Sequence, residues 1–115
     1  MTNEKRAFER KQLRLELNYR HADGGNFLFE RSTNISDGGI FIETAHPLPT
    51  GATLVIRFTP PGGDEIEVDG RVAWVNLVRT GDENPNPGMG IRWVDLTPEQ
   101  REIIGSIVKT VAILG

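Results

Sequence analysis

Short alternations of apolar and polar residues fill most of the chain. In the first of them, the leucines at positions 13, 15 and 17 and Tyr19 alternate with polar residues, a period of two that is typical of a β-strand with one buried face. Similar segments, separated by turns rich in glycine, proline and asparagine, predict six strands. The predicted strands fall at about residues 13–19, 27–33, 40–44, 54–58, 65–77 and 89–93.

The fifth predicted strand is the longest. Its inner face is expected to consist of Ile66, Val68, Val72 and Trp74, which keep the period of two. Gly70 falls in the middle of that face. A glycine at this place predicts a bulge or a sharp bend, as barrels need at their corners.

A change of period marks the C-terminal end of the chain. Thr97 is a good N-cap, Pro98 suits the first helical position, and Gln100 completes a capping box. An apolar stripe then predicts a helix over about residues 98–113, formed by Ile103, Ile104, Ile107, Val108, Val111 and Leu114. Six short strands followed by one helix predict a small antiparallel barrel or sandwich, with the helix packed on it or on a partner.

Length and composition limit the class of protein. The 115 residues suit one domain, and 37% apolar with 25% charged residues fit neither a disordered tail nor a membrane protein. There are no cysteines, which removes disulfides and cysteine chemistry and is compatible with the cytoplasm, where we expect the protein. The first ten residues hold no apolar run, so we predict no signal peptide, and we expect no membrane insertion.

Charge is unevenly spread along the chain. Residues 4–14 contain five basic and two acidic residues, a local net charge of +3 in a chain whose net charge is -3. We therefore predict a flexible basic arm over residues 1–12 and an acidic domain over residues 13–115. Arginine makes up most of the basic residues and suits phosphate and the guanine edge, although a GC-rich genome explains the same bias. The acidic body argues against DNA or RNA as a partner.

Enzyme chemistry is not expected. His21 and His46 lie far apart in the sequence with no third ligand at metal spacing, so both are interpreted as surface loop residues and no metal is predicted. Ser36 does not lie in a nucleophile elbow. The carboxylates between residues 64 and 69 alternate with apolar residues, as expected for the solvated face of a strand.

Two short motifs stand above this background. Arg6 and Arg10 form an Arg-x-x-x-Arg pair that faces one way in a helix or a strand and suits a doubly charged ligand; a solvated basic segment is the alternative. In residues 34–39, Asn34 and Ser36 supply directed hydrogen bonds, and Gly39 lets the backbone approach a ligand or adopt positive φ. An ordinary turn between two strands is the alternative here.

The two motifs together resemble those of the PilZ domain, a family that binds the bacterial second messenger cyclic diguanylate (c-di-GMP). Other segments resemble the family in the same order: residues 39–51 its next strand and turn, residues 70–75 its long central strand, and residues 88–96 its closing strand. The resemblance covers nearly the whole chain from about Glu4. It implies an all-β fold, a six-stranded antiparallel PilZ-type β-barrel with a C-terminal helix.

The resemblance also implies which residues bind the ligand. Paired arginines of the family hold guanine edges and phosphates, and the loop after the second strand holds the other side of the guanine. The residues that match are Arg6, Arg10, Asn34, Ser36 and Gly39. Lys5 stands where many members have arginine, so it keeps the charge without the stacking fork and leaves the number of bound ligand molecules open.

The function implied by the resemblance is that of a c-di-GMP receptor without cofactor or catalysis. Ligand binding would order the arm, and an unidentified downstream protein would read the changed surface, in second messenger signalling such as the control of motility. The alternative is a ligand-independent interaction module, as in PilZ-like proteins that lack the motifs. A monomer and a homodimer are both compatible with the sequence.

Overall fold

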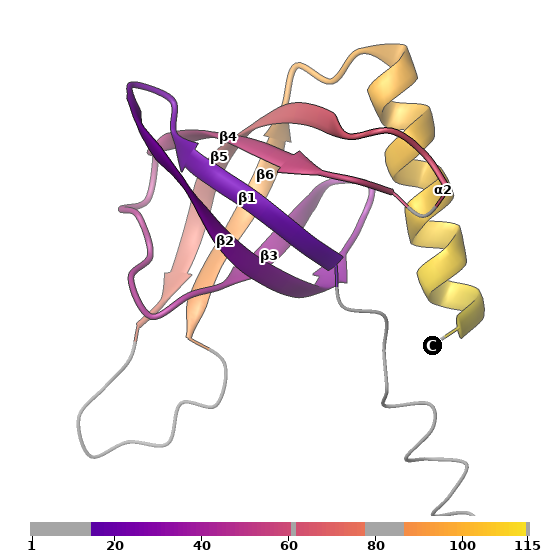
Figure 1. Cartoon of the computed structure of the whole chain (residues 1–115). Coiled ribbons are helices and arrows are strands. Elements are labelled where there is room, and N and C mark those ends of the chain that lie inside the picture. Colours follow the sequence, from indigo (N-terminus) through magenta and orange to yellow (C-terminus); the bar gives the residue numbers. More distant parts are fainter. Residues whose placement is uncertain (1–14, 61, 78–86, 115) are drawn as a thin grey trace, which may run out of the picture.

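Six strands form a closed ring in the computed structural model, which describes residues 15–60, 62–77 and 87–114 (Figure 1). The ring follows the order β1-β2-β3-β6-β5-β4, and every neighbouring pair is antiparallel, including β4 with β1. The predicted six-stranded antiparallel barrel with a C-terminal helix is confirmed. The elements are β1 (Leu15–His21), β2 (Gly24–Ile35), β3 (Gly39–Glu43), β4 (Thr53–Phe58), β5 (Ile66–Asn76), β6 (Gly88–Val94) and α2 (Pro98–Leu114).

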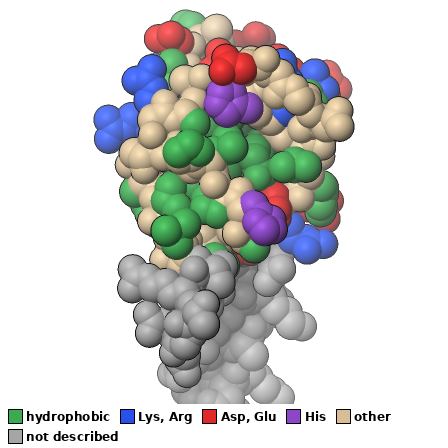
Figure 2. Space-filling view, turned by 90° about the vertical axis from the view of Figure 1, so that its left-hand side faces the viewer, with side chains coloured by type: hydrophobic (Ala, Val, Ile, Leu, Met, Phe, Trp, Pro, Cys, Tyr) green, Lys and Arg blue, Asp and Glu red, His purple; other side chains and the backbone are tan. Residues whose placement is uncertain are grey.

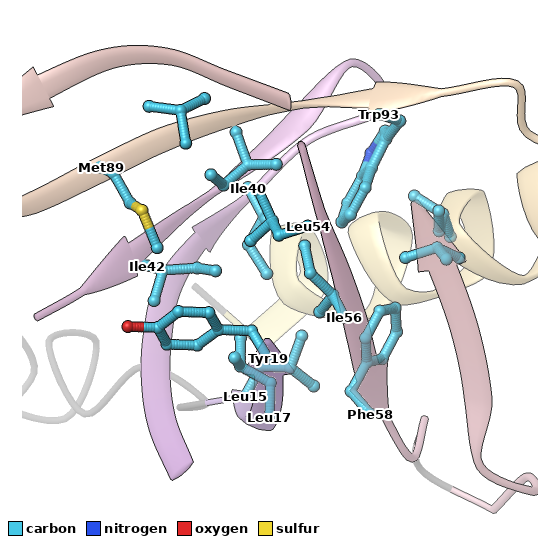
Figure 3. Packing of buried hydrophobic residues seen from close by; sticks show 14 of the residues in the cluster. Leu15, Leu17, Tyr19, Ile40, Ile42, Leu54, Ile56, Phe58, Met89 and Trp93 are labelled. Atoms are coloured by element: carbon cyan, nitrogen blue, oxygen red, sulfur yellow. The ribbon is translucent and has the colours of Figure 1, made fainter. Parts of the chain in front are cut away.

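Alternate residues of the strands fill the barrel. In β1, Leu15, Leu17 and Tyr19 are buried, as the alternation predicts. Figure 3 shows Tyr19 inside the barrel, close to Ile42 and Met89 from the opposite strands. Burial raises the pKa of the Tyr19 hydroxyl above its ordinary value, although a hydrogen bond with Thr44 opposes the shift. The interior is therefore a packed core, and a ligand must bind on the outside of the barrel or at its ends.

Gly70 is not the bulge that the sequence predicts. It keeps regular pairing with Leu54 of β4 and Trp93 of β6. A Cβ at this position would lie 2.4 Å from Cγ2 of Ile91. The missing side chain at Gly70 therefore makes room inside the barrel for a residue from the next strand.

The bulge in β5 lies three residues further on, at Ala73. Pairing with β6 is regular up to Val72 and shifts register before Trp74. An extra residue in one strand reverses the faces of the residues that follow. Trp74 is consequently 53% exposed, and its predicted place on the inner face is wrong.

The helix begins with the predicted capping box. The Thr97 amide donates to Oε1 of Gln100 at 2.9 Å, and the Gln100 amide donates to Oγ1 of Thr97 at 3.0 Å. Ile104 and Ile107 are buried in the same core cluster as the barrel residues, so the helix packs on the barrel (Figure 1). No helix in the described part of the chain is long and apolar enough to cross a membrane.

Candidate functional site

The connection between β2 and β3 is a compact loop closed by Ser36. The Ser36 amide donates to the Gly39 carbonyl at 2.8 Å, and the Gly39 amide donates back to the Ser36 carbonyl at 3.3 Å. The Ser36 hydroxyl oxygen accepts the amides of Gly38 and Gly39 at 3.3 and 3.2 Å. The serine side chain is thus part of the loop's own hydrogen bonding, as in the turns that serine favours.

Strand β6 makes two hydrogen bonds to the loop. The Trp93 indole Nε1 donates to the Ser36 carbonyl at 3.1 Å, and the Trp93 amide donates to the Gly38 carbonyl at 3.1 Å. Trp93 is itself almost fully buried and lies beside α2 (Figure 3). The loop is therefore attached by two hydrogen bonds to a residue that is fixed in the core.

Gly39 lies where no side chain fits. A Cβ there would approach the Ile91 carbonyl oxygen to 1.9 Å. The positive φ considered for Gly39 is not adopted, since the described glycines with positive φ are those at positions 24, 25, 51 and 62. Glycine at position 39 is required by the close approach of β3 to β6.

Asn34 lies at the end of β2, after an irregularity in the pairing with β3. The register shifts between Arg31 and Asn34. The buried Ser32 hydroxyl bonds to both the amide and the carbonyl of Asn34, each at 3.2 Å. Ser32 thereby satisfies its own buried oxygen and fixes the backbone that carries the exposed Asn34 side chain.

These loop residues line one wall of an open cleft of about 880 Å³. Asn34, Ser36 and Gly39 all lie along it, so the structure brings together three of the residues predicted for the ligand site. The other walls come from β3, β5, β6 and the start of α2, and include Phe41, Trp74, Arg92 and Arg101. The cleft is polar on the loop side and aromatic on the β5 side.

Two arginines and two aspartates supply the charges of the cleft. Arg92 lies opposite Gly39 in the pairing of β3 with β6, and Arg101 lies in the first turn of α2. Neither arginine makes an ion pair within the described ranges of the chain. Asp37 and Asp95 line the same cleft. Two unpaired guanidinium groups can therefore bind a phosphate or the acceptor edge of guanine.

Sequence reasoning missed Arg92 and Trp74 for different reasons. Arg92 alternates with Ile91 and Trp93 and so belongs to the outer face of its strand, but only the pairing of β3 with β6 puts it beside the loop. The alternation predicts Trp74 in the core because no glycine in the sequence marks the bulge at Ala73.

The two histidines of the chain lie apart on its surface. His46 is exposed and His21 is partly exposed, and Figure 2 shows histidine side chains separated by hydrophobic groups on one face. Among the residues that the structure describes, no group of three or more His, Cys, Asp or Glu side chains could hold a metal ion. The predicted arm, with Lys5, Arg6 and Arg10, lies outside the described residues.

Comparison with protein families gives a match over residues 4–110, to the PilZ domain. The chain belongs to the PilZ domain family. PilZ domains are binding modules whose ligand is c-di-GMP, with no metal cofactor indicated. Comparison with curated proteins gave no significant match.

Solved PilZ domains share the fold at low sequence identity. The c-di-GMP-bound PilZ domain of YcgR from Escherichia coli is 16% identical with a TM-score of 0.65, covering 90% of this chain and 91% of that one. The PilZ domain of CeSA from a cellulose-synthesizing bacterium is 17% identical, with a TM-score of 0.60 and coverages of 90% and 94%. The Bacillus subtilis inhibitor of motility MotI/DgrA is 16% identical with a TM-score of 0.65, and the match covers 86% of this chain and 47% of that one.

Proposed function

We propose that this PilZ domain is a cytoplasmic c-di-GMP receptor that signals through a protein partner. The observation that carries the proposal is the cleft, because Asn34, Ser36 and Gly39 meet there beside Arg92 and Arg101, which make no ion pair with any other residue that the structure describes. The neighbour YcgR binds c-di-GMP through the same fold, and MotI/DgrA is named as an inhibitor of motility. Residues 13–115 would form the binding domain, and residues 1–12 a basic arm.

The loop would hold guanine by hydrogen bonds from one side. Asn34 offers an amide that can donate and accept, and the loop backbone is already closed by the Ser36 hydroxyl. Arg92 can donate two bonds to O6 and N7 of guanine or pair with a phosphate. Because the loop is attached to Trp93, little conformational entropy would be lost there on binding.

The arm would close the site from the other side. Residues 1–12 hold four basic and two acidic side chains, a net charge of +2 that is attracted by the two phosphates of c-di-GMP, to which Arg6 and Arg10 would bind, with Lys5 nearby. Binding would then convert a flexible basic segment into an ordered and partly neutralised surface. The partner protein would recognise that surface, and no catalysis would be involved.

Calorimetry with c-di-GMP, and with GTP as the control ligand, tests the proposal. Replacing Arg6 or Arg10 with alanine should weaken binding by about 1–3 kcal/mol, roughly ten- to a hundredfold. Arg31→Ala is the matched control, since this exposed arginine lies outside the cleft on β2. Unchanged affinity in the double variant of Arg6 and Arg10 would contradict the assignment of the arm.

Amide exchange with and without c-di-GMP tests the conformational change. Protection is expected to rise at residues 5–11 and 34–39, while α2 stays unchanged because it already packs on the barrel. An arm that is already protected in the free protein would rule out the switch, even if the ligand binds tightly.

A further inference from the structure

The outer face of strands β1, β2 and β4 carries three arginines and two phenylalanines. In the pairing of these strands, Phe29 and Arg57 both lie opposite Asn18, which alternates with the buried residues of β1. Alternation along the strands puts three further residues on the same side. What we call the arginine–phenylalanine face consists of Arg20, Phe27, Phe29, Arg31 and Arg57. None of these five residues lines the cleft, so the face is separate from the proposed ligand site.

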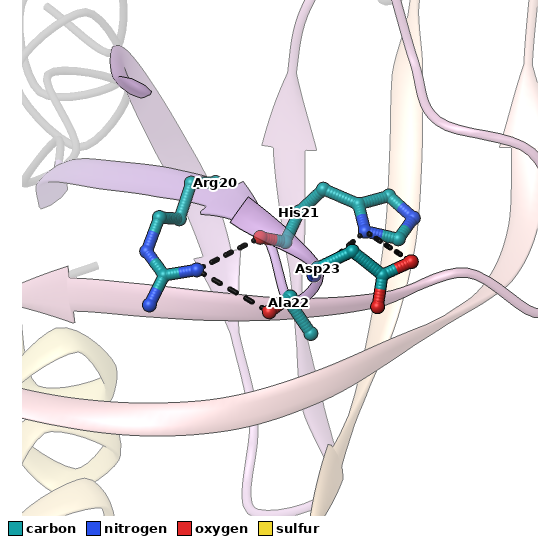
Figure 4. A network of polar contacts seen from close by, with 4 residues as sticks. All are labelled: Arg20, His21, Ala22 and Asp23. Carbon is teal, nitrogen blue, oxygen red and sulfur yellow. Dashed lines mark hydrogen bonds and ion pairs between the residues drawn. The ribbon is translucent and has the colours of Figure 1, made fainter. Parts of the chain in front are cut away.

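The ring of Phe27 contacts two guanidinium groups. The Cζ atoms of Arg57 and Arg20 lie 4.1 and 5.3 Å from its centroid. Arg20 also donates to two backbone carbonyls of the β1–β2 turn (Figure 4), and Nε of Arg57 donates to Oε2 of Glu67 at 2.8 Å. Both guanidinium groups therefore have a fixed position before any partner arrives, which lowers the entropy that binding would cost.

Phe29 is covered much less than a core residue would be. The Cζ atom of Arg31 lies 5.5 Å from the centroid of its ring, and Phe29 is still 53% exposed. Aromatic residues and arginine are the residue types that are enriched in protein–protein interfaces. An exposed phenyl ring among arginines that are already held in place is therefore suited to bind another protein.

The charges of the face favour an acidic partner. Arg20 and Arg31 make no ion pair with any other residue that the structure describes, whereas Arg57 is paired with Glu67. Glu16 lies opposite Arg31 in the pairing of β1 with β2, but the two side chains do not form an ion pair. The continuous phosphate backbone of a nucleic acid would meet both glutamates. A short acidic segment of a protein can instead reach the two unpaired guanidinium groups alone.

We propose that a protein partner docks on the arginine–phenylalanine face with an acidic segment that also carries an apolar side chain. Carboxylates of the segment would bind Arg20 and Arg31, and the apolar side chain would pack on Phe29. The inference rests on the proposed function for the existence of a protein partner, and its contact adds to the one proposed for the ordered arm. Because the face lies outside the cleft, c-di-GMP and the partner can be bound at the same time.

Selection of binders from a random peptide library displayed on phage tests the docking surface. The selected peptides should be rich in aspartate and glutamate and should contain an apolar residue. Phe29→Ser, and the double variant of Arg20→Gln and Arg31→Gln, should each weaken binding of these peptides by about tenfold or more. Leu28→Ser is the matched control, because Leu28 is also 53% exposed but lies opposite Tyr19, on the other face of β2. It should bind the peptides like the unmodified protein, and thermal unfolding of each variant checks that the fold is kept.

Several outcomes would overturn the inference. They are the selection of no peptides, the selection of peptides that are not acidic, and equal peptide affinity in Phe29→Ser and Leu28→Ser. Light scattering of the protein alone, and binding to anionic phospholipid vesicles or to single-stranded DNA, are measured on the same variants. Self-association, vesicle binding or DNA binding that Phe29→Ser abolishes would assign the face to a second copy, a membrane or a nucleic acid instead.

Calorimetry with c-di-GMP separates this inference from the proposed function. The variants of the arginine–phenylalanine face should all bind c-di-GMP like the unmodified protein, since they leave the cleft intact. A failure of the unmodified protein to bind c-di-GMP would overturn the proposed function, while the peptide selection, which uses no c-di-GMP, would still decide whether the face docks an acidic segment.

Discussion

The two connections at the ends of β2 are both short and have glycines in them or directly beside them, but they are held in different ways. In the β1–β2 turn the side-chain hydrogen bonds are local (Figure 4), and one backbone bond, from the Ala22 amide to the Thr53 carbonyl at 2.9 Å, joins the turn to β4. The Arg20 guanidinium donates to the carbonyls of His21 and Ala22, and the Asp23 amide donates to Nδ1 of His21. The side chains that hold this turn therefore bind only to neighbours in the sequence.

The β2–β3 loop is held instead by a side chain from a strand that is far away in the sequence. The Trp93 indole that binds the Ser36 carbonyl is 57 residues away. The glycines at the two connections also differ, in their backbone conformation and in the space around them. Gly24 and Gly25 have φ of 133° and 98°, and nothing lies within 4 Å of a Cβ added at either position. A Cβ added at Gly39 would instead clash with the β6 backbone at Ile91.

Glycine therefore has two different roles. At the first connection it allows a positive φ, and at the second it allows two strands to approach closely. A loop fixed by tertiary contacts has its shape before a ligand arrives, which favours a preorganised site over an ordinary turn. Three substitutions test whether the two connections really differ in this way.

The largest effect is expected for Gly39→Val. The valine would force its Cβ into the Ile91 carbonyl, and the clash is relieved only if β3 separates from β6. The free energy of unfolding should fall by about 3 kcal/mol or more, measured by denaturant titration. Gly38→Val is the matched control, since nothing lies within 4 Å of a Cβ there. Equal stability of the two variants would mean that the close approach of β3 to β6 does not require glycine at position 39.

A smaller effect is expected for Trp93→Phe. Loss of the indole removes the hydrogen bond to the Ser36 carbonyl and some core volume, and should cost about 2 kcal/mol of stability. Phe58→Leu is the control, because Phe58 contacts Trp93 in the core without bonding to the loop. Both variants should be destabilised, but only Trp93→Phe should speed amide exchange in residues 36–39. Equal exchange in both would mean that the indole does not hold the loop.

The smallest effect is expected for Ser36→Ala. The variant loses the acceptor for two loop amides, but the site is exposed and water can replace it, so about 1 kcal/mol of stability is at stake. Affinity for c-di-GMP should fall more clearly than stability, because the loop loses its closed shape. The comparable change in the other turn is His21→Ala, which removes the Nδ1 acceptor of the Asp23 amide. It should leave affinity unchanged, and calorimetry on both variants would reveal any exception.

Local patterns predicted most of the fold. The alternation in β1 and the capping box at Thr97 each depend on residues close together in the sequence, and both are found in the structure. The prediction failed where the pairing between strands distant in the sequence determines which way a side chain faces. The bulge at Ala73 and the position of Arg92 beside Gly39 follow from the register of β6 with its two neighbours, which periodicity does not contain.

The closed ring has a consequence for how a partner can bind. Each of the six strands in the described part of the chain pairs with a neighbour on both sides over at least part of its length, so no strand is an edge strand along its whole length. The ring therefore offers a partner no full-length strand edge for strand addition, which is one way in which an extended peptide binds to a β-protein. We expect a partner to recognise side chains on the outside of the barrel or on α2. Such a partner could distinguish the free protein from the ligand-bound protein by its surface side chains, without any strand having to leave the sheet.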